Sequence, residues 1–138
     1  MSIPKRILQA AAIPIRDTKI CLVTSRSGKR WVILKGCLEA GKSERDIALQ
    51  EAWEEAGLRG ILNPHAVGSY SYEKWGDRYH VTVFLMEVTA VANDWPERRL
   101  RQRSWLRPAQ ALGRITDDRL HALLGIVFAE KRIGSAFL

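Results

Sequence analysis

The sequence predicts an α+β fold, an α/β/α sandwich in which a mixed β-sheet lies between helices. Three features favour it: short β-branched segments fill the first quarter of the chain, one helix follows them, and further strands precede a second helix with an apolar face. The chain has 138 residues, of which 46% are hydrophobic and 27% charged, a size and composition typical of one globular domain. We therefore expect a single domain covering residues 1–138.

The first strands are expected in three segments before the helix. Residues 8–15 are rich in Ala and Ile and include Pro14, which favours a strand near a sheet edge because proline cannot donate to the ladder. Residues 20–24 are apolar and follow a polar turn, so the two segments predict a hairpin. Residues 31–34 predict a further short, buried strand.

A helix is expected between residues 43 and 57. Ser43 is a good N-cap, and Asp46 three residues later resembles the acid of a capping box. Gly57 is a natural C-terminal stop because glycine tolerates the left-handed conformation. A stripe of small side chains would let this helix approach a sheet closely: Ala48, Ala52 and Ala56.

More strands and then helices are expected after this helix. The strands are predicted at residues 60–67, 67–74, 79–91 and 100–106. The tripeptide Trp75-Gly76-Asp77 favours a hairpin turn between the second and third of them. A short helix is expected at residues 108–112, and a longer one after Thr116. Apolar residues at helical spacing predict that the longer helix packs in the core: Leu120, Leu123, Leu124, Val127 and Phe128.

The net charge of +7 favours an anionic partner. No nucleic-acid-binding motif and no apolar run of membrane-spanning length is present, so we expect an anionic phosphorylated small molecule rather than nucleic acid or a membrane. A homodimer is left open. Cys21 and Cys37 match no disulfide framework or zinc spacing, and the N-terminus lacks a secretory signal, so we expect a cytoplasmic protein.

Three carboxylates, Glu51, Glu54 and Glu55, lie three and four residues apart near the end of the expected helix. Residues at this spacing share a helix face, where three anions repel one another unless a cation lies among them. Hard oxygen ligands suit Mg²⁺ or Mn²⁺, and a backbone carbonyl near Lys35 or Gly36 would extend the ligand set. The alternative is a solvated acidic face, which is common because helices favour glutamate. The basic balance of the whole chain favours the metal site.

These residues resemble a Nudix box. The box consists of glycine, five residues, Glu, seven residues, and then Arg-Glu-apolar-x-Glu-Glu-x-Gly-apolar, and its spacing is kept without insertion from Gly36 to Leu58. The resemblance implies a Nudix hydrolase, which cleaves the pyrophosphate bridge of a nucleoside diphosphate linked to another group. It also implies that Glu51, Glu54 and Glu55 are catalytic and bind the metal together with Gly36.

The likeness extends to the diphosphoinositol polyphosphate phosphohydrolase branch of that family. The similar stretches are residues 23–26, 30–31, 54–60, 67–68, 78, 88–89, 94–95 and 101–105. Members of the branch hydrolyse inositol pyrophosphates and dinucleoside polyphosphates, which suits the positive charge. By this resemblance the substrate-binding residues are Arg26, Arg78, Arg101 and Arg103, and the alternative for each is an ordinary surface arginine.

Two positions depart from the box. Lys42 replaces its first glutamate, and Gln50 replaces the arginine before the glutamates. The resemblance implies that these positions support the metal-bearing helix, so losing the acid and the base together removes a charge interaction. Gln50 can still hydrogen-bond a carboxylate, but it supplies no charge. We therefore expect metal binding to survive and turnover to be reduced.

The expected mechanism is metal-assisted hydrolysis of a phosphoanhydride. Bound metal lowers the pKa of the attacking water, whose proton passes to Glu51 or to a loop acid; Glu73, Asp77 and Glu97 are the candidates. Two other functions stay open. A Nudix-fold binding module would hold a phosphorylated ligand without turnover, and an RNA-end processing or RNA-binding protein would show steeply salt-dependent RNA affinity.

Overall fold

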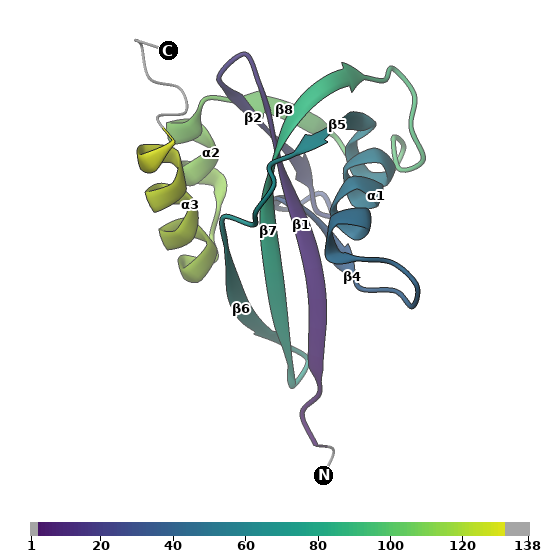
Figure 1. Cartoon of the computed structure of the whole chain (residues 1–138), viewed down its shortest axis with the longest axis vertical. Coiled ribbons are helices and arrows are strands. Elements are labelled where there is room, and N and C mark those ends of the chain that lie inside the picture. The colour runs from purple at the N-terminus through teal and green to yellow at the C-terminus, as the bar shows by residue number, and fades with distance from the viewer. Residues whose placement is uncertain (1–2, 132–138) are drawn as a thin grey trace.

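The computed structural model describes residues 3–131, in which strands and helices follow one another as Figure 1 shows. The strands are β1 (Arg6–Arg16), β2 (Lys19–Thr24), β3 (Trp31–Val32), β4 (Leu34–Cys37), β5 (Leu58–Leu62), β6 (Gly68–Lys74), β7 (Asp77–Val91) and β8 (Arg103–Leu106). The helices are α1 (Glu44–Ala56), α2 (Pro108–Arg114) and α3 (Asp118–Glu130).

The strands form one mixed sheet built around a parallel pair, β1 and β7. β5 and β6 both pair with β7, and β2 pairs with β3 and β8. β1 is therefore a central strand, and the prediction of an edge strand at residues 8–15 is wrong. Pro14 is tolerated because it lies where β1 changes partners: the pairing with β4 ends at Ala12, and the pairing with β2 begins at Ile15.

Both predicted hairpins are confirmed, and three expected strands have different bounds. β1 and β2 pair antiparallel, as do β6 and β7. The expected strand at 31–34 is divided at Ile33, because β3 pairs with β2 and β4 pairs with β1. The strand expected at 60–67 starts directly after α1, at Leu58, and ends before Asn63-Pro64. The strand expected at 100–106 begins only at Arg103.

Helices cover both faces of the sheet, which confirms the α/β/α sandwich (Figure 1). Under α1, the predicted alanine stripe packs in one core against small residues of β1, Ala10 and Ala12. Small side chains on both elements let the helix lie close to the sheet. On the other face, Leu124 and Phe128 of α3 pack in a second core with Ile13 of β1. Within residues 3–131 the structure has no helix long and apolar enough to cross a bilayer.

Candidate active site

Helix α1 carries the acidic residues, and both of its ends are capped as predicted. The Ser43 hydroxyl accepts a hydrogen bond from the Asp46 amide at 3.1 Å, and the Asp46 carboxylate accepts one from the Ser43 amide at 3.0 Å. Gly57 ends the helix with a left-handed φ of 67°. One side of α1 packs on the sheet, and the adjacent side directs Glu51 and Glu55 toward β4.

Glu55 is buried, with only 5% of its surface exposed. Its Oε1 accepts a hydrogen bond from the Lys35 amide at 3.0 Å, and its Oε2 lies 2.9 Å from Nη2 of Arg101. Burial raises the pKa of Glu55 to about 7, although Arg101 and the Lys35 amide oppose the increase. The carboxylate is therefore held in one orientation from two sides.

Glu51 lies directly against Gly36 of β4. A Cβ at position 36 would stand 2.3 Å from Glu51 Oε1, so only glycine leaves room for the carboxylate there. Burial, followed by repulsion from Glu55 and Glu54, raises the pKa of Glu51 to about 8. The glycine of the motif thus has a steric role that its spacing alone did not explain.

The residues present fit a divalent cation. No ion pair in residues 3–131 involves Glu51 or Glu54. Mutual repulsion between hard oxygen ligands is the electrostatic condition that Mg²⁺ or Mn²⁺ relieves. In the described part of the chain no three His, Cys, Asp or Glu side chains lie together as a group that could already hold a metal ion. Because Glu55 is already held in one orientation, Glu51 and Glu54 are the side chains that would turn toward the metal when it binds.

The last turn of α1 is held by residues 92–103, which we call the 92–103 segment. Three successive carbonyls at the helix end accept hydrogen bonds from it, which satisfies groups that have no partner inside the helix. The donors are the Glu97 amide, the Trp95 indole and the Arg103 guanidinium, and the acceptors are the carbonyls of Glu54, Glu55 and Ala56, at 2.9, 3.1 and 2.7 Å. Sequence patterns do not predict this support, since no periodicity links a helix to a segment so far along the chain.

The four predicted substrate arginines lie in three places: at the acidic site, at the end of α1 and in a separate hollow. Arg101 is buried between Glu55 and Glu97. Its Nε lies 2.8 Å from Oε1 of Glu97. Arg103 stacks over Trp95 and binds backbone carbonyls. Arg26 is mostly exposed and lies 3.9 Å from Glu97.

Arg78, the fourth, lines a separate hollow near the start of β1. The structure thus brings Arg26 and Arg101 to the acidic site, uses Arg103 to hold the helix end, and places Arg78 in that hollow. Substrate contact by any of them stays a prediction.

Among the three candidate loop acids, only Glu97 joins the site. It pairs with Arg101, and its amide binds the Glu54 carbonyl. Glu73 and Asp77 belong to the β6–β7 hairpin, where the Asp77 carboxylate accepts a hydrogen bond from the Lys5 amide. Glu97 is therefore the loop acid closest to Glu55.

The two residues that depart from the motif, Lys42 and Gln50, hydrogen-bond each other. Lys42 Nζ donates to the side-chain oxygen of Gln50, and the Gln50 amide donates to Glu39 at 2.8 Å. Lys42 also pairs with Glu39 at 3.4 Å. The interaction between positions 42 and 50 is thus kept with donor and acceptor exchanged, and Glu39 supplies the acid that position 42 lacks. All of these contacts are at the surface.

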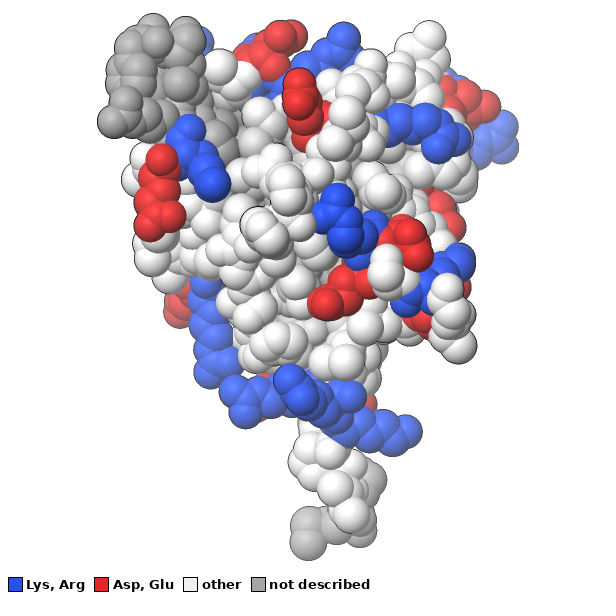
Figure 2. Space-filling view, viewed as in Figure 1, with Lys and Arg blue, Asp and Glu red and all other residues white. Residues whose placement is uncertain are grey.

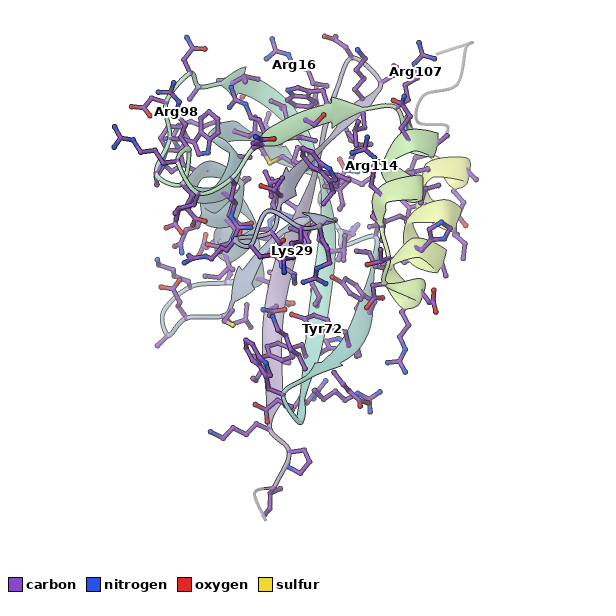
Figure 3. All side chains as sticks on the ribbon, turned by 180° about the vertical axis from the view of Figure 1, so that it is seen from behind. Arg16, Lys29, Tyr72, Arg98, Arg107 and Arg114 are labelled. Carbon is purple, nitrogen blue, oxygen red and sulfur yellow. The ribbon has the colours of Figure 1, made fainter. Side chains whose placement is uncertain are left out.

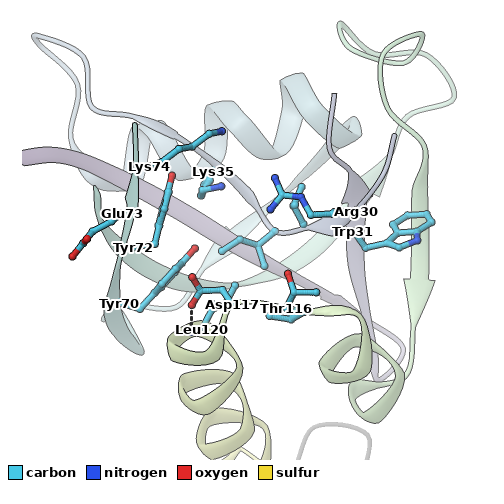
Figure 4. A pocket seen from close by; sticks show the side chains of 13 residues that line it. Arg30, Trp31, Lys35, Tyr70, Tyr72, Glu73, Lys74, Thr116, Asp117 and Leu120 are labelled. Carbon is cyan, nitrogen blue, oxygen red and sulfur yellow. Dashed lines mark hydrogen bonds between the residues drawn. The ribbon is translucent and has the colours of Figure 1, made fainter. Parts of the chain in front are cut away.

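A pocket of about 380 Å³ opens on the opposite face of the sheet from α1 (Figure 4). Its walls include Trp31, Tyr70 and Tyr72, and Lys35 lies among them. Burial lowers the pKa of the Lys35 ammonium, which lies 5.3 Å from the centre of the Tyr72 ring. Because the Lys35 amide binds Glu55, one residue connects the aromatic pocket with the acidic site.

Five arginines lie close together in the sequence but do not form one patch: Arg98, Arg99, Arg101, Arg103 and Arg107. Arg98 and Arg107 lie on different sides of the molecule when it is viewed from behind (Figure 3). Arg98 pairs with Asp94 in the 92–103 segment, whereas Arg107 stands before α2. These arginines therefore do not provide a single binding surface.

Comparisons with known proteins agree with this geometry. The NUDIX domain matches residues 5–124 of the chain. The chain is 30% identical over 97 residues to Nudix hydrolase 17, mitochondrial, of Arabidopsis thaliana, which covers 69% of this chain and 53% of that protein. It is 31% identical over 101 residues to diphosphoinositol polyphosphate phosphohydrolase 3-beta of Homo sapiens, covering 70% and 60% respectively. The chain thus spans between half and three-fifths of the length of these relatives.

Solved structures show the same fold. The solution structure of the E. coli ORF135 protein has a TM-score of 0.74 and 24% identity, and covers 96% of each chain. A binary complex of a C. elegans Ap4A hydrolase also has a TM-score of 0.74, with 18% identity, and covers 91% of this chain and 98% of that one. The match over residues 5–124 includes the whole glycine-to-leucine motif and the acidic helix, and the chain therefore belongs to the NUDIX domain family.

Proposed function

We propose that the protein hydrolyses a phosphoanhydride bond in a polyphosphorylated small molecule, with Mg²⁺ or Mn²⁺ as cofactor. The observation that carries the proposal is the group of carboxylates on α1: Glu51 and Glu55 have raised pKa values, and Glu51 lies beside a glycine that leaves room for it. In a chain with a net charge of +7, such a group is suited to a cation and, through it, to phosphate oxygens.

The roles of the residues follow from their contacts. Glu51, Glu54 and Glu55 would hold the metal together with a backbone carbonyl near Lys35 or Gly36. Bound divalent ions neutralise phosphate oxygens and lower the pKa of an attacking water. The water's proton would pass to Glu51 or Glu97, while the Lys35 amide and Arg101 keep Glu55 in its orientation.

The aromatic pocket favours a dinucleoside polyphosphate as the substrate. Aromatic rings suited to a nucleobase line it, those of Trp31, Tyr70 and Tyr72, and Asp117 offers an acceptor for an amino group. One of the solved structures with the same fold is named an Ap4A hydrolase, which supports this choice. An inositol pyrophosphate is the second candidate, since curated relatives are named for that substrate. The lining carries Arg30, Lys35 and Lys74 as well as Asp117 and Glu73, so its charge suits either substrate, and its aromatic rings favour the dinucleotide.

Hydrolysis assays distinguish these functions. Product release would be measured with diadenosine polyphosphates and inositol pyrophosphates, each with Mg²⁺, with Mn²⁺ and with EDTA. We expect metal-dependent release from a diadenosine polyphosphate that falls at least about 100-fold in Glu55→Gln. Glu44→Gln, on an exposed turn of the same helix, is the matched control and should keep full activity.

The remaining outcomes identify the other functions. Binding without turnover in the wild type would replace the enzyme by a ligand-binding module. RNA affinity that falls steeply with salt, without small-molecule hydrolysis, would favour the RNA-directed alternative.

A further inference from the structure

An exposed tryptophan stands at the tip of the β6–β7 hairpin, directly after a residue that lines the aromatic pocket. Trp75 is 83% exposed and belongs to neither of the two cores that residues 3–131 form. Burial therefore does not explain why an aromatic side chain occupies this position. Isolated apolar residues are common on protein surfaces, but the backbone and the neighbours of Trp75 set it apart.

The turn that carries Trp75 favours a different residue. Trp75 and Gly76 connect the register partners Lys74 and Asp77, and both have a positive φ, 54° and 77° respectively. Two-residue hairpin turns of this kind prefer Asn-Gly or Asp-Gly, because bulky side chains rarely adopt a left-handed backbone. The hairpin thus keeps a tryptophan where folding favours asparagine. Residues held in unfavourable conformations are concentrated at ligand sites, so the conformation of Trp75 indicates a ligand.

Lys74 connects the Trp75 ring to the aromatic pocket. Its ammonium lies 4.2 Å from the centre of that ring, and its side chain lines the pocket together with those of Lys35 and Tyr72 (Figure 4). Trp75 is three residues after Tyr72, roughly 10 Å along an extended strand. Because most of the Trp75 surface is exposed, the ring is open to a ligand that leaves the pocket past Lys74.

The tip of the hairpin is held in place by the segment before β1. The Asp77 carboxylate accepts a hydrogen bond from the Lys5 amide at 3.0 Å, and the Arg78 amide donates to the Lys5 carbonyl at 2.9 Å. A ring carried by a fixed backbone loses little conformational freedom when a ligand stacks on it. Trp75 is therefore suited to act as a binding platform.

Charge indicates which kind of ligand suits this platform. Lys and Arg side chains form a band across the end of the molecule at which the β6–β7 hairpin turns (Figures 1 and 2). Such a band attracts anions, whereas a neutral apolar partner would gain nothing from it. A nucleotide combines a flat ring with negative charge. A dinucleoside polyphosphate in addition has a second base, which lies outside the aromatic pocket when the first base occupies it.

We propose that Trp75 stacks on the second base of a dinucleoside polyphosphate whose first base occupies the aromatic pocket. The inference rests on the proposed function and adds to it a residue that distinguishes a dinucleotide from a ligand with one base. Lys74 lies between the two base sites, on the same strand face as Tyr72. Loss of a base–aromatic stack typically weakens binding about tenfold or more.

Isothermal titration calorimetry in EDTA tests the platform without metal-dependent turnover. The two ligands are diadenosine tetraphosphate and adenosine tetraphosphate, which has one base. Trp75→Ala should weaken binding of the dinucleotide at least about tenfold and leave that of adenosine tetraphosphate unchanged, whereas Trp75→Phe should retain most of the dinucleotide affinity. Ile61→Ala is the matched control, because Ile61 is 63% exposed on β5, which pairs with the other end of β7.

Trp75→Asn separates stacking from folding. Asn-Gly suits the turn, so the melting temperature should stay the same or rise, while the dinucleotide affinity falls as in Trp75→Ala. A lower melting temperature together with an equal loss of affinity for both ligands would make Trp75 a structural residue and would overturn the inference.

Three further results would overturn it: no binding of the dinucleotide to the wild type, unchanged dinucleotide affinity in Trp75→Ala, or tighter binding of another partner that depends on Trp75. The partners to compare are a 12-nucleotide single-stranded RNA and phosphatidylglycerol vesicles. If metal-dependent hydrolysis persists in any of these cases, the proposed function stands without the platform. Dinucleotide binding that depends on Trp75, without hydrolysis of any substrate, would instead remove the proposed function and keep the platform.

Discussion

Two parts of α1 are supported in different ways. At its C-terminal end, the 92–103 segment binds three successive carbonyls, and Arg101 pairs with the buried Glu55. In its middle, the Gln50 side chain is held by hydrogen bonds with the exposed side chains of Glu39 and Lys42. Water weakens the exposed contacts of Gln50 much more than the buried contacts at the C-terminal end of the helix. The departures from the family motif therefore involve exposed contacts, whereas Glu55, a proposed metal ligand, rests on buried ones.

The largest expected effect is on the buried pair. Arg101→Met removes the buried cation that pairs with both Glu55 and Glu97, and we expect it to lower the free energy of unfolding by about 3–5 kcal/mol in EDTA. Mg²⁺ should restore part of the loss if it binds at Glu55. Urea denaturation with and without Mg²⁺ measures both. Arg26→Met is the control, since Arg26 is 70% exposed and lies near the same Glu97. A loss as small as that of the control would show that the C-terminal support is not stronger.

Gly36→Ala separates activity from stability. The new Cβ would overlap Glu51 Oε1, so the carboxylate must move, and we expect turnover of the best substrate to fall about 100-fold. The free energy of unfolding should change little because a flexible side chain, not backbone, gives way. Gly113→Ala in α2 meets no atom within 4 Å and should leave turnover unchanged. Full turnover in Gly36→Ala would mean that the position of Glu51 does not matter.

The stacked arginine of the 92–103 segment should matter less than Arg101. Arg103→Gln loses hydrogen bonds to the carbonyls of Ala56 and Ala92 and the contact with Trp95, and we expect it to lower the free energy of unfolding by about 2 kcal/mol. Arg98→Gln, which breaks an exposed pair in the same segment, should have almost no effect. Thermal denaturation of both variants checks the difference, and equal melting temperatures would contradict it.

The sequence predicted what local signals determine. The caps at Ser43 and Gly57 and the spacing of the glutamates act within a few residues, and the alanine stripe correctly indicated which side of α1 faces the sheet. The sequence did not predict contacts between segments that are far apart along the chain. The central place of β1 and the support from Trp95 and Arg103 follow from the sheet order, which a strand's own residues do not specify.

Restoring the usual pair of the motif tests the weaker support. In Lys42→Glu with Gln50→Arg, the charge interaction returns to positions that already hydrogen-bond each other. We therefore expect turnover to change by no more than about threefold, well below the 10- to 100-fold typical of a lost supporting contact. Glu39→Gln, which removes the acid that now holds Gln50, should show a similarly small effect. An increase above about tenfold would show that the surface network limits the enzyme.

The two cysteines give the smallest effect and report on the two regions separately. Burial raises the pKa of the Cys21 thiol to about 12, although the Arg103 guanidinium opposes the increase, whereas Cys37 is exposed beside the glycine of the motif. At pH 8.5 we expect iodoacetamide to modify one thiol in the native protein and the second only after unfolding. Because folded Cys21 keeps its proton above the ordinary thiol pKa of 9.0, its contribution to stability is complete below pH 9 and is lost as the pH rises toward 12. Mass spectrometry of the modified peptides identifies the thiol, and Cys37→Ser should abolish the fast reaction. Equal rates for both thiols in the native protein would mean that β2, beneath the 92–103 segment, opens as readily as the exposed loop.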